Sequence, residues 1–334
     1  MSPETLERLF GWRHAFDHPV TVWIVAGVGV ILVLSFVVIL ALRASPRVSP
    51  DLKRELLKRY LAWLVIVPAV ILPILLGAAW TIAGVALLSL LCFWEFARST
   101  GLFRDRMTTS VVVIGILLLT LAVFDHWYHL FVALFPLTMG LIAAAAILRD
   151  EPKGYLQRVA LGVFGFALFG GAMSHLGYMA NDVNYRPILL LVIAATQLND
   201  VFAFVVGKSL GRRPLAPHTS PNKTVEGSLG AVLLTTPLAA ILAHYIFKGT
   251  PVDTPVRLAL LGLIISVVGQ LGDLMVSSIK RDLGIKDMGA AIPGHGGILD
   301  RCNSLLLVAP AVFHYIGYYV GFGLDQPKSI ITGG

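Results

Sequence analysis

The sequence predicts an all-α fold, that of a polytopic membrane protein with about nine or ten transmembrane helices. The first observation is composition: 57% of the 334 residues are hydrophobic and only 13% are charged, far from the balance of a soluble domain. The second is the length of the apolar runs, because a helix needs about 20 residues to cross the ~30 Å hydrocarbon core of a bilayer. The third is the alternation of basic gaps between these runs.

We expect ten spans along the chain. The pair between residues 60 and 97 is separated only by residues 77–80, so one kinked or re-entrant element is an alternative there. The expected spans are 21–43, 60–79, 80–97, 107–124, 128–148, 158–179, 187–206, 227–247, 257–279 and 299–322.

The chain divides into three regions on this interpretation. Residues 1–59 hold an interfacial lead-in, the first span and a basic segment over 44–59, which we expect to form a short helix on the membrane surface. Residues 60–206 form a transmembrane helical region. Residues 207–334 form the catalytic transmembrane region, with polar loops at 207–226 and 280–298.

Most of the 26 lysines and arginines lie in the gaps after odd-numbered spans. The positive-inside rule places these gaps, and with them both polar loops, in the cytoplasm. We therefore expect a multi-pass protein of the inner (cell) membrane whose active-site loops face the cytoplasm. The net charge of +7 is explained by the lipid bilayer, so no nucleic acid partner is indicated.

Several polar residues within the spans have structural interpretations. Glu95 lies near a membrane boundary and should pair with Arg98 on the next turn. His126 and His129 are typical of interfacial anchors rather than metal ligands. His175 should be a satisfied interior histidine in a glycine-rich span that packs closely, and such small-residue faces permit a homodimer.

Residues 270–304 hold carboxylates, cations and glycines between two apolar runs, which lipid does not explain. If the preceding helix continues through residue 281, four of these residues share one face at i, i+4, i+7 and i+8. The following helix presents a second polar face, and the glycines between them let backbone N–H groups approach an anion. A polyphosphate with magnesium would suit such a site. The first face carries Asp273, Ser277, Lys280 and Arg281; the second carries Asp300, Asn303 and Ser304; the loop holds Lys286, Asp287, Gly294, His295, Gly296 and Gly297.

A second polar stretch begins at Asn199 and Asp200, which lie at membrane depth, where an aspartate is a functional hypothesis by default. The loop that follows is rich in glycine, proline, hydroxyls and cations, as expected of a phosphate cradle. It is not a Walker loop, which requires GxxxxGK[ST] after a strand. Its cations and hydroxyls are Lys208, Arg212, Arg213, Ser220, Lys223 and Thr224.

Both stretches resemble the diagnostic elements of the phosphatidate cytidylyltransferases, also called CDP-diacylglycerol synthases. The run from Ser277 to Arg301 is similar to the family signature, and the run from Asn199 to Gly227 to a second family element. The resemblance covers roughly residues 90–320. Three positions depart from it: Val225 stands where tryptophan is usual, Cys302 where a hydrophobic residue is usual, and Asn303 where a second aspartate is usual.

The resemblance implies that CTP and phosphatidate react to CDP-diacylglycerol and diphosphate. The lipid phosphate is already ionised near neutral pH, so the reaction needs positioning and cancellation of charge more than a general base. Metal ions held by carboxylates would serve this purpose, and the resemblance implies Mg²⁺. Two alternatives stay open: another lipid phosphate as acceptor, or a non-catalytic membrane protein that binds CTP or an anionic lipid.

By position in the matched motifs, we assign roles to individual residues. Asp273 and Asp300 are the leading magnesium ligands, with Asn303 a weaker third, while Asp200 and Asp287 are alternative ligands or orient lysines. The expected catalytic residues are Asp273, Lys280, Lys286, Asp287, Asp300 and Arg301. The expected substrate-binding residues are Asn199, Asp200, Lys208, Ser220, Lys223, Thr224, Ser277, Arg281, His295, Gly296 and Gly297.

Overall fold

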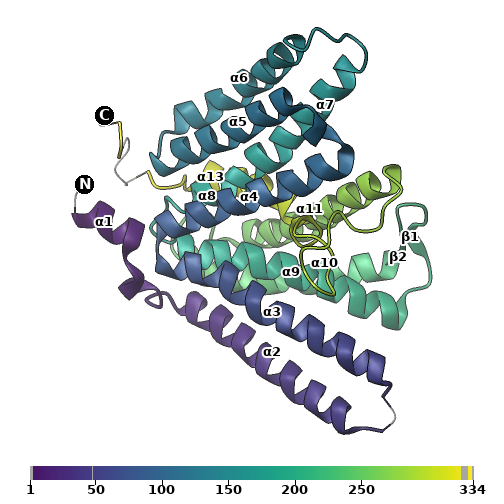
Figure 1. Ribbon diagram of the computed structural model, residues 1–334. Helices are drawn as coiled ribbons and strands as arrows, with labels where there is room; N and C mark the ends of the chain where they lie inside the picture. Colours follow the sequence, from purple (N-terminus) through teal and green to yellow (C-terminus); the bar gives the residue numbers. More distant parts are fainter. Residues whose placement is uncertain (1–2, 47, 325–329, 333–334) are drawn as a thin grey trace.

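A computed structural model describes residues 3–46, 48–324 and 330–332 as a helical bundle (Figure 1). Across these residues, nine helices are long and apolar enough to cross a membrane by length and composition, which confirms the predicted all-α polytopic class. Strand structure there is limited to one short antiparallel pair. The elements are α1 (Pro3–Phe10), α2 (Pro19–Ala44), α3 (Pro50–Leu76), α4 (Ala78–Thr100), α5 (Arg106–Phe124), α6 (Tyr128–Ile147), α7 (Tyr155–Gly165), α8 (Met173–Met179), α9 (Tyr185–Leu210), β1 (Pro214–Ala216), β2 (Ser220–Thr224), α10 (Val225–Ile246), α11 (Pro255–Asp282), α12 (Leu299–Cys302) and α13 (Leu305–Tyr319).

Residues 44–59 do not form a separate surface helix as the sequence suggested. Helix α3 runs without a break from Pro50 to Leu76, so the basic segment is its first turns. The Ser49 hydroxyl accepts from the Leu52 N–H at 3.3 Å, and Pro50 occupies the first helical position, which together start the helix.

The uncertain pair of spans at 60–97 consists of two helices, α3 and α4. They separate at Gly77, whose φ of 143° is a conformation that residues with a side chain rarely adopt. A Cβ at this position would also clash with the backbone of Leu9 in α1. The alternative of a single kinked element is therefore wrong.

The tenth expected span, 299–322, forms two consecutive helices, α12 and the 15-residue α13. Asn303 and Ser304 between them keep helical φ and ψ, so the segment is helical from Leu299 to Tyr319. The Asn303 side-chain oxygen accepts from the Ser304 N–H at 2.8 Å and so competes with the helical hydrogen bonds there. This junction places polar side chains at the start of α13.

The span predicted at 158–179 is helical throughout and contains a π-helical segment over Phe166–Ala172 between α7 and α8. Its glycines pack tightly: a Cβ on Gly162 would meet side chains of Thr108 and Ile142, which confirms close helix packing. His175 is buried and its Nδ1 lies 2.9 Å from the Gly171 carbonyl oxygen, as expected for a satisfied interior histidine.

The expectation for His126 was wrong. It is buried beside the Phe322 carbonyl, rather than anchored at the membrane surface, and its neighbour Asp125 accepts from the backbone and hydroxyl of Thr332. His129 is exposed. The C-terminal segment packs here, a contact that the sequence pattern does not reveal.

Four helices meet in the predicted catalytic region. α9 packs along α10, α10 along α11, and α11 along α13. The turn containing β1 and β2 lies at the end of the bundle opposite the N-terminal helix α1 (Figure 1). The site described next lies where this end meets the loop between α11 and α12.

Candidate active site

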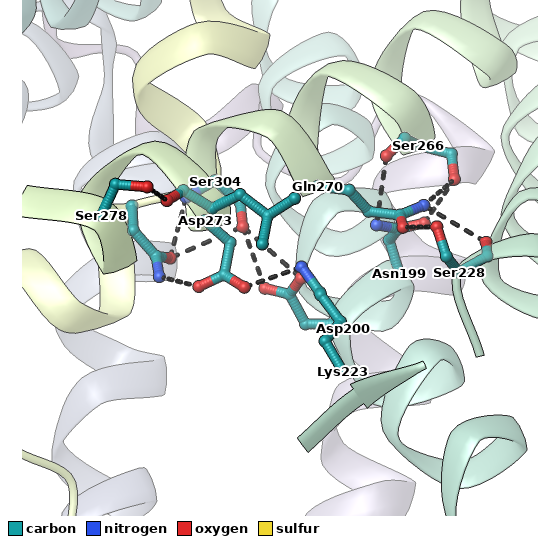
Figure 2. Close-up of polar contacts among 11 residues, drawn as sticks. Asn199, Asp200, Lys223, Ser228, Ser266, Gln270, Asp273, Ser278 and Ser304 are labelled. Carbon is teal, nitrogen blue, oxygen red and sulfur yellow. Dashed lines mark hydrogen bonds and ion pairs between the residues drawn. The ribbon is translucent and has the colours of Figure 1, made fainter. Parts of the chain in front are cut away.

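Helix α11 continues to Asp282, as the sequence predicts, and presents a ladder of polar residues toward α9 and α10. Ser266, Gln270 and Asp273 occupy positions i, i+4 and i+7, so they lie on one face. Figure 2 shows this face meeting Asn199 and Asp200 from α9. Polar side chains at membrane depth need hydrogen-bond partners, and these side chains pair with one another.

Asn199 serves helix packing in this structure. It is fully buried, and its side-chain oxygen accepts from the hydroxyls of Ser266 at 2.5 Å and Thr235 at 3.1 Å. The residue therefore joins α9, α10 and α11. The sequence had assigned it to substrate binding, but its side chain points into the bundle.

Gln270 and Ser228 continue this network, and sequence reasoning missed both. The Ser228 hydroxyl donates to the Gln270 side-chain oxygen, and the Gln270 amide donates to the Ser228 carbonyl at 3.3 Å. Gln270 lies three residues before Asp273, so the sequence could have placed both on one face of the helix. The network holds α11 against α10 immediately behind the carboxylate of Asp273.

Asp273 and Asp200 form the first acidic cluster. The Lys223 amine donates to Asp273 at 2.7 Å, and the Asn303 amide donates to the other oxygen of Asp273 at 2.6 Å. Asp200 accepts from the Ser304 hydroxyl at 3.1 Å and interacts electrostatically with Asp273 and Lys223. In Figure 2 the Lys223 amine points toward both carboxylates. The two sequence motifs thus meet at this point.

Asp300 forms a second cluster, separate in its contacts from the first. Its carboxylate accepts from the Lys280 amine at 2.8 Å and from the backbone N–H groups of Met288 and Gly297, both at 2.9 Å. The Asp300 side chain is only 2% exposed. Three donors therefore surround it, and it closes the segment between α11 and α12, here called the signature loop (residues 283–298).

Glycine is required at two positions of the signature loop. Gly294 and Gly296 have φ of 75° and 81°, in the left-handed region that favours glycine. A Cβ on Gly296 would lie 3.0 Å from Asp300 and 3.2 Å from Asp287, so both carboxylates border this turn. The Asp287 side chain is otherwise exposed, which leaves it accessible to a ligand.

Glu95 on α4 has different partners from those we predicted. Instead of pairing with Arg98, its carboxylate accepts from the backbone N–H groups of Ile298 at 3.0 Å and Leu299 at 2.9 Å. One turn later, the Ser99 hydroxyl donates to the Met288 carbonyl at 2.9 Å. Helix α4 therefore holds the signature loop at Met288 and at its C-terminal end.

We expect Glu95→Gln to loosen this attachment. The amide keeps the shape but presents an NH₂ group to one of two N–H donors, and each buried hydrogen bond lost to a charged group costs about 1.5–3 kcal/mol. Proteolysis within residues 283–298 should become faster in the detergent-purified protein. Arg98→Gln is the matched control, and equal protease resistance of the Glu95→Gln and wild-type proteins would contradict the role of Glu95.

The turn between α9 and α10 is organised by its own contacts. β1 pairs antiparallel with β2, and Glu226 accepts from the N–H groups of Arg212 and Arg213. Thr224, which we had assigned to substrate binding, caps α10 by accepting from the Gly227 N–H at 3.1 Å. The Arg281 guanidinium donates to the Thr219 carbonyl at 3.3 Å, which joins this turn to the end of α11.

The remaining predicted residues lie on the elements that carry these two clusters. Ser220 begins β2, Ser277 is buried on α11, and Arg301 follows Asp300 with an electrostatic interaction with Asp200. Five cations at the end of α9, in the turn between α9 and α10, at the end of α11 and in the signature loop are exposed, so they are available to phosphates. They are Lys208, Arg212, Arg213, Arg281 and Lys286.

Within residues 3–46, 48–324 and 330–332, no three His, Cys, Asp or Glu side chains are grouped so as to hold a metal ion by themselves. Asp273 and Asp200 nevertheless provide two hard oxygen donors in one cluster. Magnesium is usually bound by one or two carboxylates together with substrate phosphates, so this pair fits the ion. Asp300 fits it less well, because its side chain is only 2% exposed, against 24% for Asp273, and its oxygens already accept from three donors.

Fold and site together define a polytopic membrane protein with a charged site, built from aspartates, lysines and a glycine loop, at one end of its bundle. The sequence model of the cytidylyltransferase family matches residues 57–319, and the chain belongs to this family.

Curated relatives agree with this assignment. A phosphatidate cytidylyltransferase of Synechocystis sp. is 34% identical over 275 residues, which cover 73% of this chain and 90% of the relative. The uncharacterized protein YnbB of Escherichia coli is 34% identical over 249 residues, or 72% of this chain and 81% of the relative. A phosphatidate cytidylyltransferase of Bacillus subtilis is 45% identical over 120 residues, which cover 36% and 44% of the two chains.

Proposed function

We propose that this protein is a phosphatidate cytidylyltransferase, which transfers the cytidylyl group of CTP to phosphatidate. A lipid phosphate oxygen would attack the α-phosphorus of CTP. The bond from that phosphorus to the bridging oxygen of the β-phosphate would break, giving CDP-diacylglycerol and diphosphate. The observation that carries the proposal is the ion pair between Lys223 and Asp273, because it unites the two family motifs in one site.

The chemistry of the site suits a reaction between two anions. Lys223 is a cation 12% exposed at its side chain, so its field is little screened by water. A nucleotide phosphate can take the place of Asp273 beside this lysine. The exposed cations of the two loops then neutralise further charge, and the loops fix the reactants in place.

We also propose Mg²⁺ as the cofactor, held by Asp273 and Asp200. When bound, it would neutralise charge on the nucleotide phosphates and on the departing diphosphate. Asp287, exposed beside Gly296, is placed to orient a lysine such as Lys286 or to contact a hydrated ion. Asp300 is assigned here to the architecture of the signature loop.

Asn303→Asp is expected to lower the magnesium concentration that gives half-maximal activity by about three- to tenfold. The substitution replaces an amide that donates to Asp273 with a carboxylate, so the added negative charge favours a cation at this cluster. Magnesium titration of activity, together with Mg²⁺ binding measured calorimetrically, checks the prediction. No change in either quantity would count against a metal at this position, and Asn222→Asp in the exposed turn is the control.

The acceptor is tested by following the α-phosphate of CTP. Detergent-purified protein is given α-labelled CTP with phosphatidate, lysophosphatidate or a polyprenyl phosphate, and the lipid fraction is analysed. We expect label in CDP-diacylglycerol. Label in another lipid would favour a different acceptor, which the departures at Val225, Cys302 and Asn303 motivate. Binding of CTP without labelled lipid from any acceptor would favour a non-catalytic role.

We propose that the protein resides in the inner membrane with the two loops in the cytoplasm. The excess of cations in the connections on that side supports this orientation. A cysteine in place of exposed Asn222 should react with an impermeant maleimide in inverted vesicles and not in intact cells; the reverse pattern would contradict it. Assembly as a homodimer stays a prediction.

A further inference from the structure

The outer edge of the signature loop lies against helix α3, a contact that the sequence motifs do not include. Glu55, Arg59 and Trp63 occupy positions i, i+4 and i+8 of α3 and share one face. A Cβ on Gly294 would lie 3.3 Å from the Arg59 side chain and 3.4 Å from the Glu55 carboxylate. The Trp63 ring meets the His295 ring edge to face, with centroids 5.8 Å apart.

Positive charge predominates at this edge. Burial lowers the pKa of His295, and the nearby charges of Arg301 and Arg59 lower it further, partly offset by the Pro293 carbonyl and Glu55. The Nε of Arg301 is buried and has no hydrogen-bond partner among the described residues. Arg301 also interacts with Asp200, so its charge acts on both halves of the site. An anion at this edge would supply the hydrogen-bond acceptor that the Arg301 Nε lacks.

The same edge borders the lipid. Helix α3 is one of the least buried spans, with 11% of its most apolar 18 residues buried, and the Arg59 side chain itself is 55% exposed. The turn that carries Lys223 instead packs against α9, α10 and α11. A ligand at Arg59 can therefore keep its phosphate at the site and its acyl chains in the bilayer.

We propose that Arg59, Trp63 and His295 bind the phosphomonoester headgroup of the lipid acceptor, with Arg301 between that headgroup and Asp200. This inference rests on the proposed function and assigns its acceptor subsite to α3. Arginine suits the role because its guanidinium binds phosphate through two parallel hydrogen bonds. Tryptophan is enriched at the level of the lipid headgroups, so Trp63 is consistent with a headgroup site there. Glu55, which pairs with Arg59 at 2.9 Å, competes with the phosphate for the guanidinium.

Because Glu55 competes with the phosphate for Arg59, substitutions of these two residues should change the KM for phosphatidate in opposite directions. Arg59→Ala should raise the KM for phosphatidate about tenfold and change the KM for CTP less than about twofold, because only the lipid loses a contact. Arg59→Lys should give a KM for phosphatidate between those of the wild type and Arg59→Ala, since lysine keeps the charge but cannot form two parallel hydrogen bonds. Glu55→Gln should lower the KM for phosphatidate. Arg54→Ala is the matched control: this exposed arginine of the same helix pairs with Asp51 at 2.8 Å and should leave both constants unchanged.

A binding measurement separates this inference from the proposed reaction. Equilibrium binding of dioctanoyl phosphatidate, inorganic phosphate and dioctanoyl glycerol is compared for wild type, Arg59→Ala and Glu55→Gln. We expect binding of phosphatidate alone, weakened in the first variant and strengthened in the second. Such binding without turnover would overturn the proposed reaction and keep the subsite. Equal binding by all three proteins, Arg59-dependent binding of inorganic phosphate as tight as that of the lipid, or a raised KM for CTP would overturn the subsite.

Discussion

Asp273→Asn is expected to reduce cytidylyl transfer by about 10³-fold or more, equivalent to roughly 4 kcal/mol of lost transition-state stabilisation. Asparagine keeps the shape of the side chain but removes the charge that faces Lys223 and that would hold magnesium with Asp200. The initial rate of CDP-diacylglycerol formation with saturating CTP and Mg²⁺ measures the effect.

Asp282→Asn provides the matched control, because it makes the same change on an exposed turn of the same helix. The control should retain activity within about twofold, since surface substitutions rarely exceed about ±0.5 kcal/mol. Wild-type activity of the Asp273→Asn protein would remove Asp273 from the reaction and with it the proposed magnesium site.

Asp300→Ala should destabilise the signature loop by about 3–5 kcal/mol and abolish activity as a consequence. The substitution leaves the Lys280 amine, 11% exposed, without its carboxylate, and leaves two backbone N–H groups without an acceptor. Thermal stability in detergent and the rate of proteolysis within residues 283–298 measure the loss.

A second substitution separates architecture from metal binding. Lys280→Met in the Asp300→Ala background removes the unpaired cation and should restore part of the thermal stability. If the Asp300→Ala protein is inactive but keeps wild-type stability and protease resistance, Asp300 acts directly on magnesium or substrate, as its place in the family motif implies.

Local patterns predicted the elements that carry the site. The helical periodicity of residues 257–281 correctly places Asp273, Ser277, Lys280 and Arg281 on one face of α11. The length and polarity of the apolar runs give the fold class, because both depend only on composition and spacing. The two motifs pointed to one site, and the contact of Lys223 with Asp273 joins them.

Contacts between distant segments were beyond such patterns. Glu95 accepts from backbone groups about 200 residues later in the chain, and nothing in its own helix distinguishes that from a pair with Arg98. Arg59 and Trp63 were assigned to a membrane-surface segment or a plain span, because their proximity to His295 depends on how α3 packs. The three donors around Asp300 include two main-chain N–H groups, which carry no sequence signal.

The final span differs from its prediction in one local contact. Its apolar content predicts a span over 299–322, and the backbone is helical from Leu299 to Tyr319, but the Asn303 side-chain oxygen accepts from the Ser304 N–H where α12 ends and α13 begins. Asn303, which departs from the family signature, therefore contacts both the Asp273 carboxylate and the backbone at the start of α13.

Diphosphate release from CTP by the detergent-purified wild-type protein in the presence of Mg²⁺, with and without phosphatidate, tests the proposed reaction most directly. We expect release that requires phosphatidate, matches CDP-diacylglycerol formation one to one and is absent from the Asp273→Asn variant. Bound CTP with no phosphatidate-dependent release of diphosphate would contradict the proposed reaction.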